Sequence, residues 1–221
     1  MTKFGVVFSV LMVGSAIVGA LRVESRSDDG IDIGVLGNQR LTAINGAVLY
    51  LLILAVVVTV LNISEFLTAH YVVGLLLVPP VVLKLGSTGY RVFRYYTGNA
   101  AFRVAGPPPI VLRFITGPIL VIATLMTLAT GIELWLVGLR FGTGWAVVHT
   151  VSAVAMLVAV AVHLLSHTRM SGAAVKDEVL GGRNRGISQR SLVLAALIFG
   201  GILAVAVFVY PSPFPPSAIG A

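Results

Sequence analysis

The sequence predicts an all-α fold, a bundle of about six transmembrane helices that forms a single integral membrane domain over residues 1–221. One observation is composition: 57% of the residues are hydrophobic and 10% are charged, whereas soluble domains carry about 25% charged residues. The other is that the apolar residues gather into stretches of about 20, the length needed to cross a bilayer core about 30 Å thick. Six such stretches leave no room for a sizeable soluble domain.

Six apolar stretches qualify as membrane spans. In chain order they are Phe4–Leu21, Leu41–Leu61, Phe66–Leu85, Ile110–Leu139, Gly144–Leu165 and Ser191–Tyr210. The first also resembles a signal peptide, because Lys3 precedes its apolar run. No clear cleavage site follows Ala20, so we expect this stretch to remain as a span. If it were cleaved, the other five spans would keep their orientation.

The basic residues predict the orientation of the bundle. The net charge of +7 does not indicate a nucleic-acid partner, because 13 of the 15 Lys and Arg residues fall in the three loops on one side of the six spans. Only Lys3 and Arg140 fall on the other side. By the positive-inside rule the basic loops are cytoplasmic, so we expect a multi-pass protein of the plasma (inner) membrane, surrounded by lipid, with both termini external.

All four histidines lie in the middle spans: His70 in the third, and His149, His163 and His167 in the fifth. Ionisable residues at membrane depth are costly and mark functional sites, although a single histidine can also serve only to hydrogen-bond a neighbouring helix. His149 and His163 are 14 residues apart, which places them about 21 Å apart on one helix face. Because histidine is an axial ligand of haem iron, this spacing indicates two haems, one near each edge of the bilayer.

Each haem would need a second ligand from a facing span. His70 and His149 lie at similar depths on spans that run in the same direction, which predicts a bis-histidine site near the external face. Lys84 follows His70 by 14 residues and is expected to face His163 at the cytoplasmic level. A neutral lysine could ligate iron, could hold a haem propionate, or could extend to the lipid headgroups.

Two further features of these spans affect the inner level. His167 lies one turn beyond the preceding histidine, and it is either an interfacial residue or an alternative inner ligand. Pro79 and Pro80 are expected to distort the third span, because proline lacks the N–H that continues the helix. Depth comparisons across them are therefore approximate.

The loop between the third and fourth spans is rich in arginine and tyrosine. Arg91 and Arg113 in particular are candidates to hold haem propionates, anionic lipid headgroups or a partner protein. A plain topology signal with aromatic anchoring explains the same residues. Near the external end of the fourth span, Glu133 is expected either to relay a proton or to reach the interface.

Four segments carry a resemblance to known proteins: HYVVGLLLVPPVVLKLGSTGYRVFRYYTG, GPPPIVLRF, ATGIELWL and HTVSAVAMLVAVAVHLLSH. They resemble a family of actinobacterial cytochrome b-like membrane proteins and, more distantly, bacterial cytochrome b-561 and the cytochrome b subunits of hydrogenases and formate dehydrogenases. The resemblance implies a four-helix haem-binding core over residues 40–168, with peripheral helices 4–21 and 191–210. It places His70, His149 and His163 at ligand positions. By this resemblance two haem b groups are expected. The wider families have a fourth histidine where this chain has Lys84, and for that reason a single haem is the alternative.

The expected function is that of a b-type di-haem membrane cytochrome. It would carry electrons across the bilayer between a quinone or cytoplasmic donor and another redox protein, alone or with respiratory-complex subunits. An enzyme of this kind would also reduce a quinone or ferric iron, but no catalytic residue is assigned. The alternative is a haem-free transporter or an assembly subunit of a respiratory complex; the chain shows no internal repeat of the kind that many transporters have.

Overall fold

The computed structural model describes residues 32–106, 112–180, 187–210 and 213, and for residues 112–113 and 165–180 it describes the backbone alone. Within these ranges the chain is helical and contains no strand. Five of the described helices are long and apolar enough to cross a membrane. The predicted all-α membrane bundle is therefore confirmed, while the expected first span, Phe4–Leu21, lies outside the described residues.

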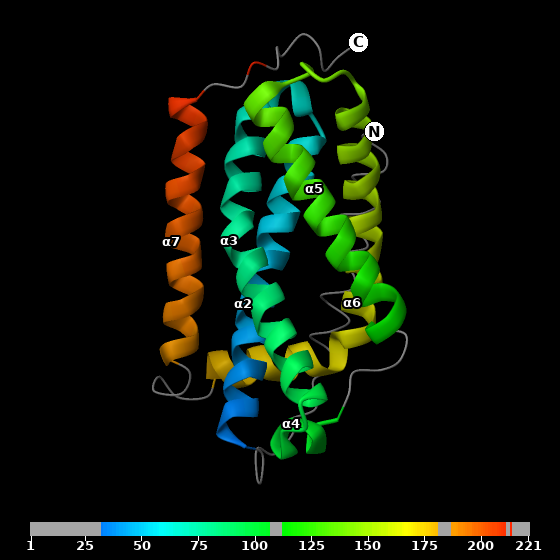
Figure 1. The fold of residues 1–221 in the computed structure, drawn as a ribbon. Helices are drawn as coiled ribbons and strands as arrows, with labels where there is room; N and C mark the ends of the chain where they lie inside the picture. The colour runs from blue at the N-terminus through cyan, green and yellow to red at the C-terminus, as the bar shows by residue number, and fades with distance from the viewer. Residues whose placement is uncertain (1–31, 107–111, 181–186, 211–212, 214–221) are drawn as a thin grey trace.

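The described elements follow one another with short connections (Figure 1). They are α2 (Ile33–Val60), α3 (Ile63–Tyr96), the short α4 (Ala100–Val104), the π-helical turn η1 (Leu112–Thr116), α5 (Gly117–Val137), α6 (Gly144–Leu180) and α7 (Ile187–Val209).

Four helices, α2, α3, α6 and α7, are longer than the apolar stretches that predicted them. Helix α2 begins at Ile33, because the Asp32 carboxylate caps it by accepting the backbone N–H groups of Gly34 and Val35 at 2.8 and 3.3 Å. Helices α3 and α6 continue past their apolar stretches to Tyr96 and Leu180. The last part of α6 turns across the end of the bundle (Figure 1). Hydropathy thus marks the part of each helix that suits the bilayer rather than the whole helix.

Four helices form a closed ring. Helix α2 packs against α3 and α6, and α5 packs against the same two helices. Helices α3 and α6 are therefore diagonal partners that face each other across the middle of the ring. Helix α7 packs on α3 and α2 from outside the ring, as Figure 1 shows.

Helix α3 runs through Pro79 and Pro80 with helical dihedral angles, and its one non-helical residue is Phe66. Two neighbours accommodate the prolines. The buried Asn45 of α2 donates its side-chain N–H to the Pro80 carbonyl oxygen at 2.7 Å. Gly200 of α7 lies so close that a Cβ there would be 2.6 Å from the Leu76 carbonyl oxygen, which the missing N–H of Pro80 leaves without its helical partner.

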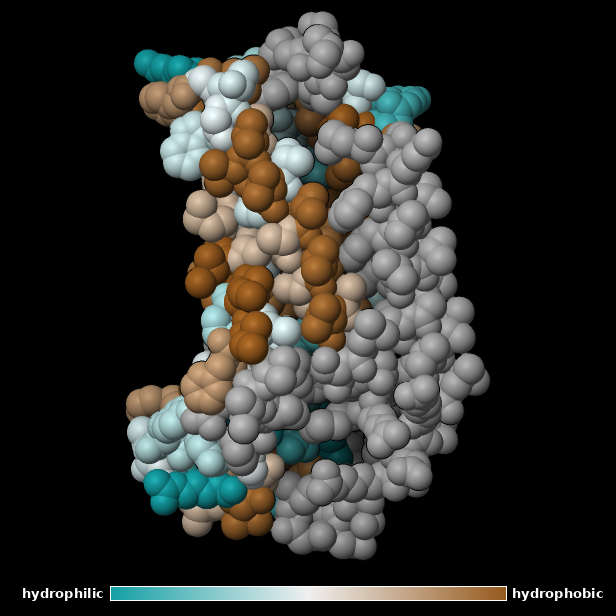
Figure 2. Space-filling view, turned by 90° about the vertical axis from the view of Figure 1, so that its right-hand side faces the viewer, coloured by the Kyte–Doolittle hydropathy of each residue, from teal (hydrophilic) through white to brown (hydrophobic). Residues whose placement is uncertain are grey.

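Polar and apolar side chains are distributed as a membrane protein requires. Figure 2 shows apolar side chains along the middle of the described surface and hydrophilic ones near its two ends. Apart from Arg140, the described basic side chains belong to the half of the bundle that contains α4; they are Arg40, Lys84, Arg91, Arg94, Arg103 and Arg190.

Candidate functional site

The structure brings His70 of α3 and His149 of α6 together across the diagonal of the four-helix ring. Their ring centroids are 6.3 Å apart and their planes are inclined by 82°. Both rings are partly buried. Because α3 and α6 run in the same direction through the bundle (Figure 1), the two histidines reach one level near the end opposite α4.

The ring of His70 is anchored through one nitrogen. Its Nδ1 lies 2.8 Å from the hydroxyl oxygen of Thr59, a buried residue of α2. That hydroxyl donates its only proton to the Val56 carbonyl oxygen at 2.6 Å, so it can only accept from the histidine. His70 Nδ1 therefore carries the hydrogen, and in the neutral ring Nε2 keeps its lone pair.

His149 is held in the same tautomer by α5. Its Nδ1 lies 3.0 Å from the backbone carbonyl oxygen of Thr127, which can only accept a hydrogen bond. The Thr130 hydroxyl lies 3.2 Å from the same nitrogen and donates to the Met126 carbonyl oxygen at 2.6 Å. In the neutral ring, Nε2 of His149 is therefore also left as a lone-pair donor.

The separation of the two ring centroids matches that of two imidazoles bound to one iron. An iron–imidazole bond of about 2.05 Å, as for zinc, and a ring radius of about 1.1 Å, from ring bonds of about 1.33 Å, put opposed imidazole centroids about 6.3 Å apart. The observed separation is 6.3 Å. Metal-ligating histidines almost always donate their other N–H to an oxygen, and both rings do so here.

The separation alone would also suit an edge-to-face ring contact. What distinguishes this pair is that an oxygen fixes each histidine at Nδ1, so that Nε2 of each neutral ring keeps the lone pair that a metal ligand needs. A further fit comes from Gly131 of α5, where an added Cβ would lie 3.0 Å from Cε1 of His149. Beside His70, the position of a Cβ on Gly74 has no atom within 4 Å, so this face is open.

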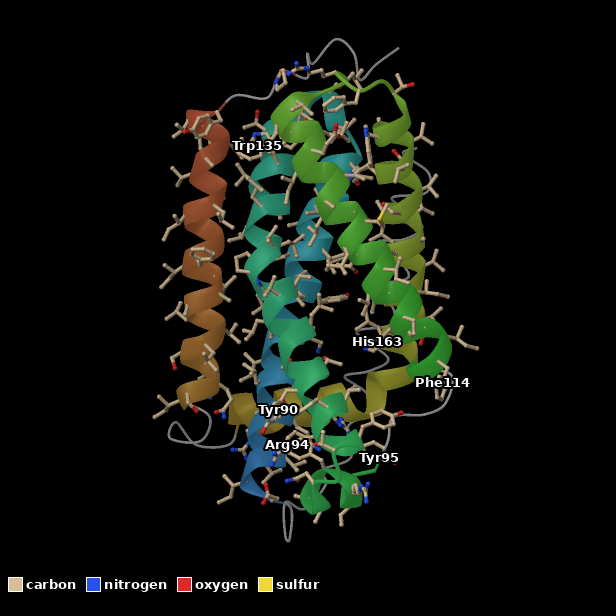
Figure 3. All side chains as sticks on the ribbon, viewed as in Figure 1. Tyr90, Arg94, Tyr95, Phe114, Trp135 and His163 are labelled. Atoms are coloured by element: carbon tan, nitrogen blue, oxygen red, sulfur yellow. The ribbon has the colours of Figure 1, made fainter. Side chains whose placement is uncertain are left out.

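The inner level is arranged differently. Lys84 is only partly exposed, and its ammonium group donates to the Thr42 carbonyl oxygen of α2 at 2.7 Å. A Cβ on Gly46, also in α2, would lie 3.2 Å from Lys84 Nζ. His163 lies on α6 in the half of the bundle nearer to α4 (Figure 3). Iron ligation by His163 and Lys84 stays a prediction, and the side chain of His167 lies outside the described residues.

The basic residues of the third loop are only partly described. Arg91 donates from Nη2 to the Gly106 carbonyl oxygen at 3.3 Å, and the side chain of Arg113 lies outside the described residues. Arg94, which was not singled out as a candidate, lies over two aromatic rings. Its guanidinium carbon is 5.9 Å from the centroid of the Tyr90 ring and 6.0 Å from that of the Phe102 ring. Figure 3 shows Tyr90, Arg94 and Tyr95 at the end of the bundle with α4.

The threonines that orient the histidines were missed by sequence reasoning. Thr59, Thr127 and Thr130 are each at most 9% exposed, although they are polar residues in apolar helices. A buried hydroxyl at the depth of a histidine on a neighbouring span is the signal that could have found them. Threonine also bonds to its own helix backbone, so this signal is ambiguous until the rotation of each helix is known.

Among the described residues, no group of three or more His, Asp or Glu side chains could hold a metal ion. Haem does not need such a group, because the macrocycle supplies the remaining ligands of the iron. Comparisons with protein-family models, curated proteins and solved structures found no match. The geometry of the histidine pair is therefore the main indication of what this protein does.

Proposed function

We propose that this chain is a b-type membrane cytochrome that binds haem between α3 and α6, with His70 and His149 as axial ligands. The observation that supports this best is the matched anchoring of the two rings: each Nδ1–H is bound by an oxygen of a neighbouring helix, and the centroids are 6.3 Å apart. Haem, when bound, would accept and release one electron.

The residues around the site would hold and orient the axial ligands. Thr59 and Thr127 fix the rotation of the two imidazoles, and hydrogen bonding of this kind raises the basicity of a ligand. Gly131 leaves the space that the His149 ring occupies. The apolar helices around them would exclude water, which is one of the factors that set a haem potential.

The wider proposal has three parts. A second haem is held at the inner level by His163, with Lys84 as ligand or propionate contact. Electrons pass between a quinone or cytoplasmic donor and another redox protein or respiratory subunit. The end with α4 faces the cytoplasm of a cell bounded by this membrane, because the described basic residues gather there.

The first test is a reduced-minus-oxidised absorption spectrum of the detergent-purified protein, with haem counted per chain. We expect a b-type spectrum, and both His70→Ala and His149→Ala should lose the outer haem, so that the haem count falls by one per chain. The matched control is His163→Ala, which should keep the outer haem and lose the inner one if two are present. A colourless wild-type protein would contradict the proposal and favour a haem-free transporter or assembly subunit.

A further inference from the structure

Arg94, in the last turn of α3, is held between two aromatic rings at the end of the bundle that contains α4 (Figure 3). Its guanidinium carbon lies 5.9 Å from the centroid of the Tyr90 ring and 6.0 Å from that of the Phe102 ring, where a cation is attracted by the ring faces. Its Nε is buried without a hydrogen-bond partner, and among the described residues none forms an ion pair with this guanidinium. The group is thus fixed in place while its N–H donors are left for something else.

The two rings form a platform that α3 and α4 build together. Tyr90 lies one turn before Arg94 on α3, and Phe102 of α4 meets its ring edge to face, with the centroids 5.7 Å apart. Phe102 is only 4% exposed, and the Asn99 side chain caps α4 by accepting the backbone N–H of Phe102 at 3.3 Å. The Tyr90 side chain, in contrast, is 49% exposed. The platform is therefore anchored in the protein on the Phe102 side and open to the surroundings on the Tyr90 side.

The depth of this guanidinium matches that of lipid headgroups. The apolar stretch of α3 ends at Leu85, and Tyr90 comes five residues later, which is about 7.5 Å along the helix axis. Because helical side chains lean toward the N-terminus, Arg94 reaches back to the level of that ring. The headgroup layer occupies about 5 to 7.5 Å beyond each edge of the hydrocarbon core. Exposed aromatic side chains at the same end, Phe93 and Tyr96, are also typical of a membrane interface.

The charge at this end of the bundle favours a lipid with a net negative charge. Arg91 lies three residues before Arg94 on α3, and Arg103 lies on α4. The chain has no Asp or Glu from residue 66 to residue 132. The acidic side chain described in this half of the bundle, Asp32, already caps α2. A zwitterionic headgroup would bring a further positive charge to these arginines, whereas an anionic headgroup would not.

We propose that Arg94 binds the phosphate group of an anionic phospholipid in the leaflet on the α4 side of the bundle. Its guanidinium donates N–H groups to the phosphate oxygens, in a planar arrangement that arginine provides and lysine does not. Inorganic phosphate offers the same oxygens, but it has no acyl chains to fill the apolar layer beside the half-exposed Tyr90. Arg91 already donates to the Gly106 carbonyl oxygen and Arg103 is exposed, so these two add charge rather than a fixed site. The lipid site does not depend on the proposed haem.

The test is native mass spectrometry of the detergent-purified full-length protein, titrated with phosphatidylglycerol or with phosphatidylcholine of the same acyl chains. We expect the wild-type protein to bind phosphatidylglycerol more tightly. Arg94→Ala should weaken that binding roughly fivefold, which is what one basic residue contributes near an anionic membrane surface, and Arg94→Lys should restore only part of it. Arg140→Ala is the matched control, because Arg140 is exposed in the turn at the opposite end of the bundle; it should bind phosphatidylglycerol as the wild type does.

Other outcomes would overturn the proposal and leave the cytochrome intact. Equal losses in Arg94→Ala and Arg103→Ala would mean that charge attracts lipid without a specific site. Displacement of the lipid by millimolar inorganic phosphate would assign Arg94 to a soluble anion, and equal wild-type affinity for both lipids would exclude an anionic-lipid site. If Arg94→Ala changes the circular dichroism spectrum, Arg94→Gln replaces it, because glutamine keeps a long side chain over the rings and removes the charge. It should show the same loss of lipid binding with an unchanged spectrum.

Discussion

The outer and inner levels of the bundle use their polar side chains for different purposes. At the outer level, His70 and His149 are held from behind by oxygens of α2 and α5, and the nitrogens that remain can bind a ligand between α3 and α6. At the inner level, Lys84 donates directly to a carbonyl oxygen of the adjacent helix α2. A polar side chain in a span can thus be oriented so that a second atom is left for a ligand, or it can be used to fasten two helices. The atom to which it is hydrogen-bonded distinguishes the two cases.

Further hydrogen bonds at the inner level also hold α2 and α3 together. Thr42 donates its hydroxyl to Ser87 at 3.2 Å, and Ser87 donates to the Lys84 carbonyl oxygen at 3.0 Å. Asn45 bonds the Pro80 carbonyl oxygen. All of these contacts join α2 to α3 or lie within α3, so they fasten these two helices to each other at the inner level.

The largest effect is expected from filling the space beside His149. In Gly131→Val, the Cβ would lie 3.0 Å from Cε1, and the ring cannot move away freely because its Nδ1 is bound by Thr127. We expect haem affinity to fall roughly 100-fold, the upper end for changes around a metal ligand. Titration of the apoprotein with haemin measures it. Gly201→Val, where a Cβ meets nothing within 4 Å, should bind haem normally; equal losses in both would refute the outer site.

A smaller effect is expected from removing the oxygen that orients His70. Thr59→Val keeps the shape of the side chain and loses the acceptor for Nδ1–H, so haem affinity should fall roughly 10-fold. Thr59→Ser should restore it. The exposed Thr150, whose hydroxyl bonds its own helix at 2.9 Å, is the control: Thr150→Val should leave haemin binding unchanged. Wild-type affinity in Thr59→Val would show that the anchor has no role in ligation.

At the inner level, Lys84→Met distinguishes fastening from ligation. If Lys84 only fastens α3 to α2, the haem content per chain stays the same. The free energy of unfolding then falls by about 1 kcal/mol, from the lost hydrogen bond. Haem counting and denaturant-induced unfolding in detergent measure the two quantities. Loss of one of two haems would instead support Lys84 as an iron ligand.

The smallest effect is expected from Gly46→Ala. The new Cβ would lie 3.2 Å from Lys84 Nζ, but that atom ends a flexible side chain and can shift. We expect the haem spectrum to be unchanged and the free energy of unfolding to move within about 0.5 kcal/mol. A large loss of stability, measured by the same unfolding assay, would mean that the Lys84–Thr42 contact is as rigid as the histidine pair.

Residue spacing along the chain could predict the spans and the level of the histidines, because rise per residue converts sequence separation into depth. It could not predict helix ends such as Asp32 and Tyr96, since hydropathy reports the bilayer and not the cap. The hydrogen-bond partner of Lys84, the Thr42 carbonyl oxygen, could not be predicted either. A backbone carbonyl oxygen has no sequence signature, and its availability depends on how α2 is rotated. Thr59 and Thr130 were missed for the same reason.

The close approach of Gly200 to the Leu76 carbonyl oxygen has a consequence for how the protein is made. A carbonyl group that lacks its helical N–H is costly in lipid, and α3 enters the membrane long before α7 is synthesised. The nascent chain must therefore carry α3 with this carbonyl oxygen uncovered until α7 arrives and packs on it. A protein truncated before α7 would be exposed at that point, so quality control could recognise it even though the four-helix ring is already closed.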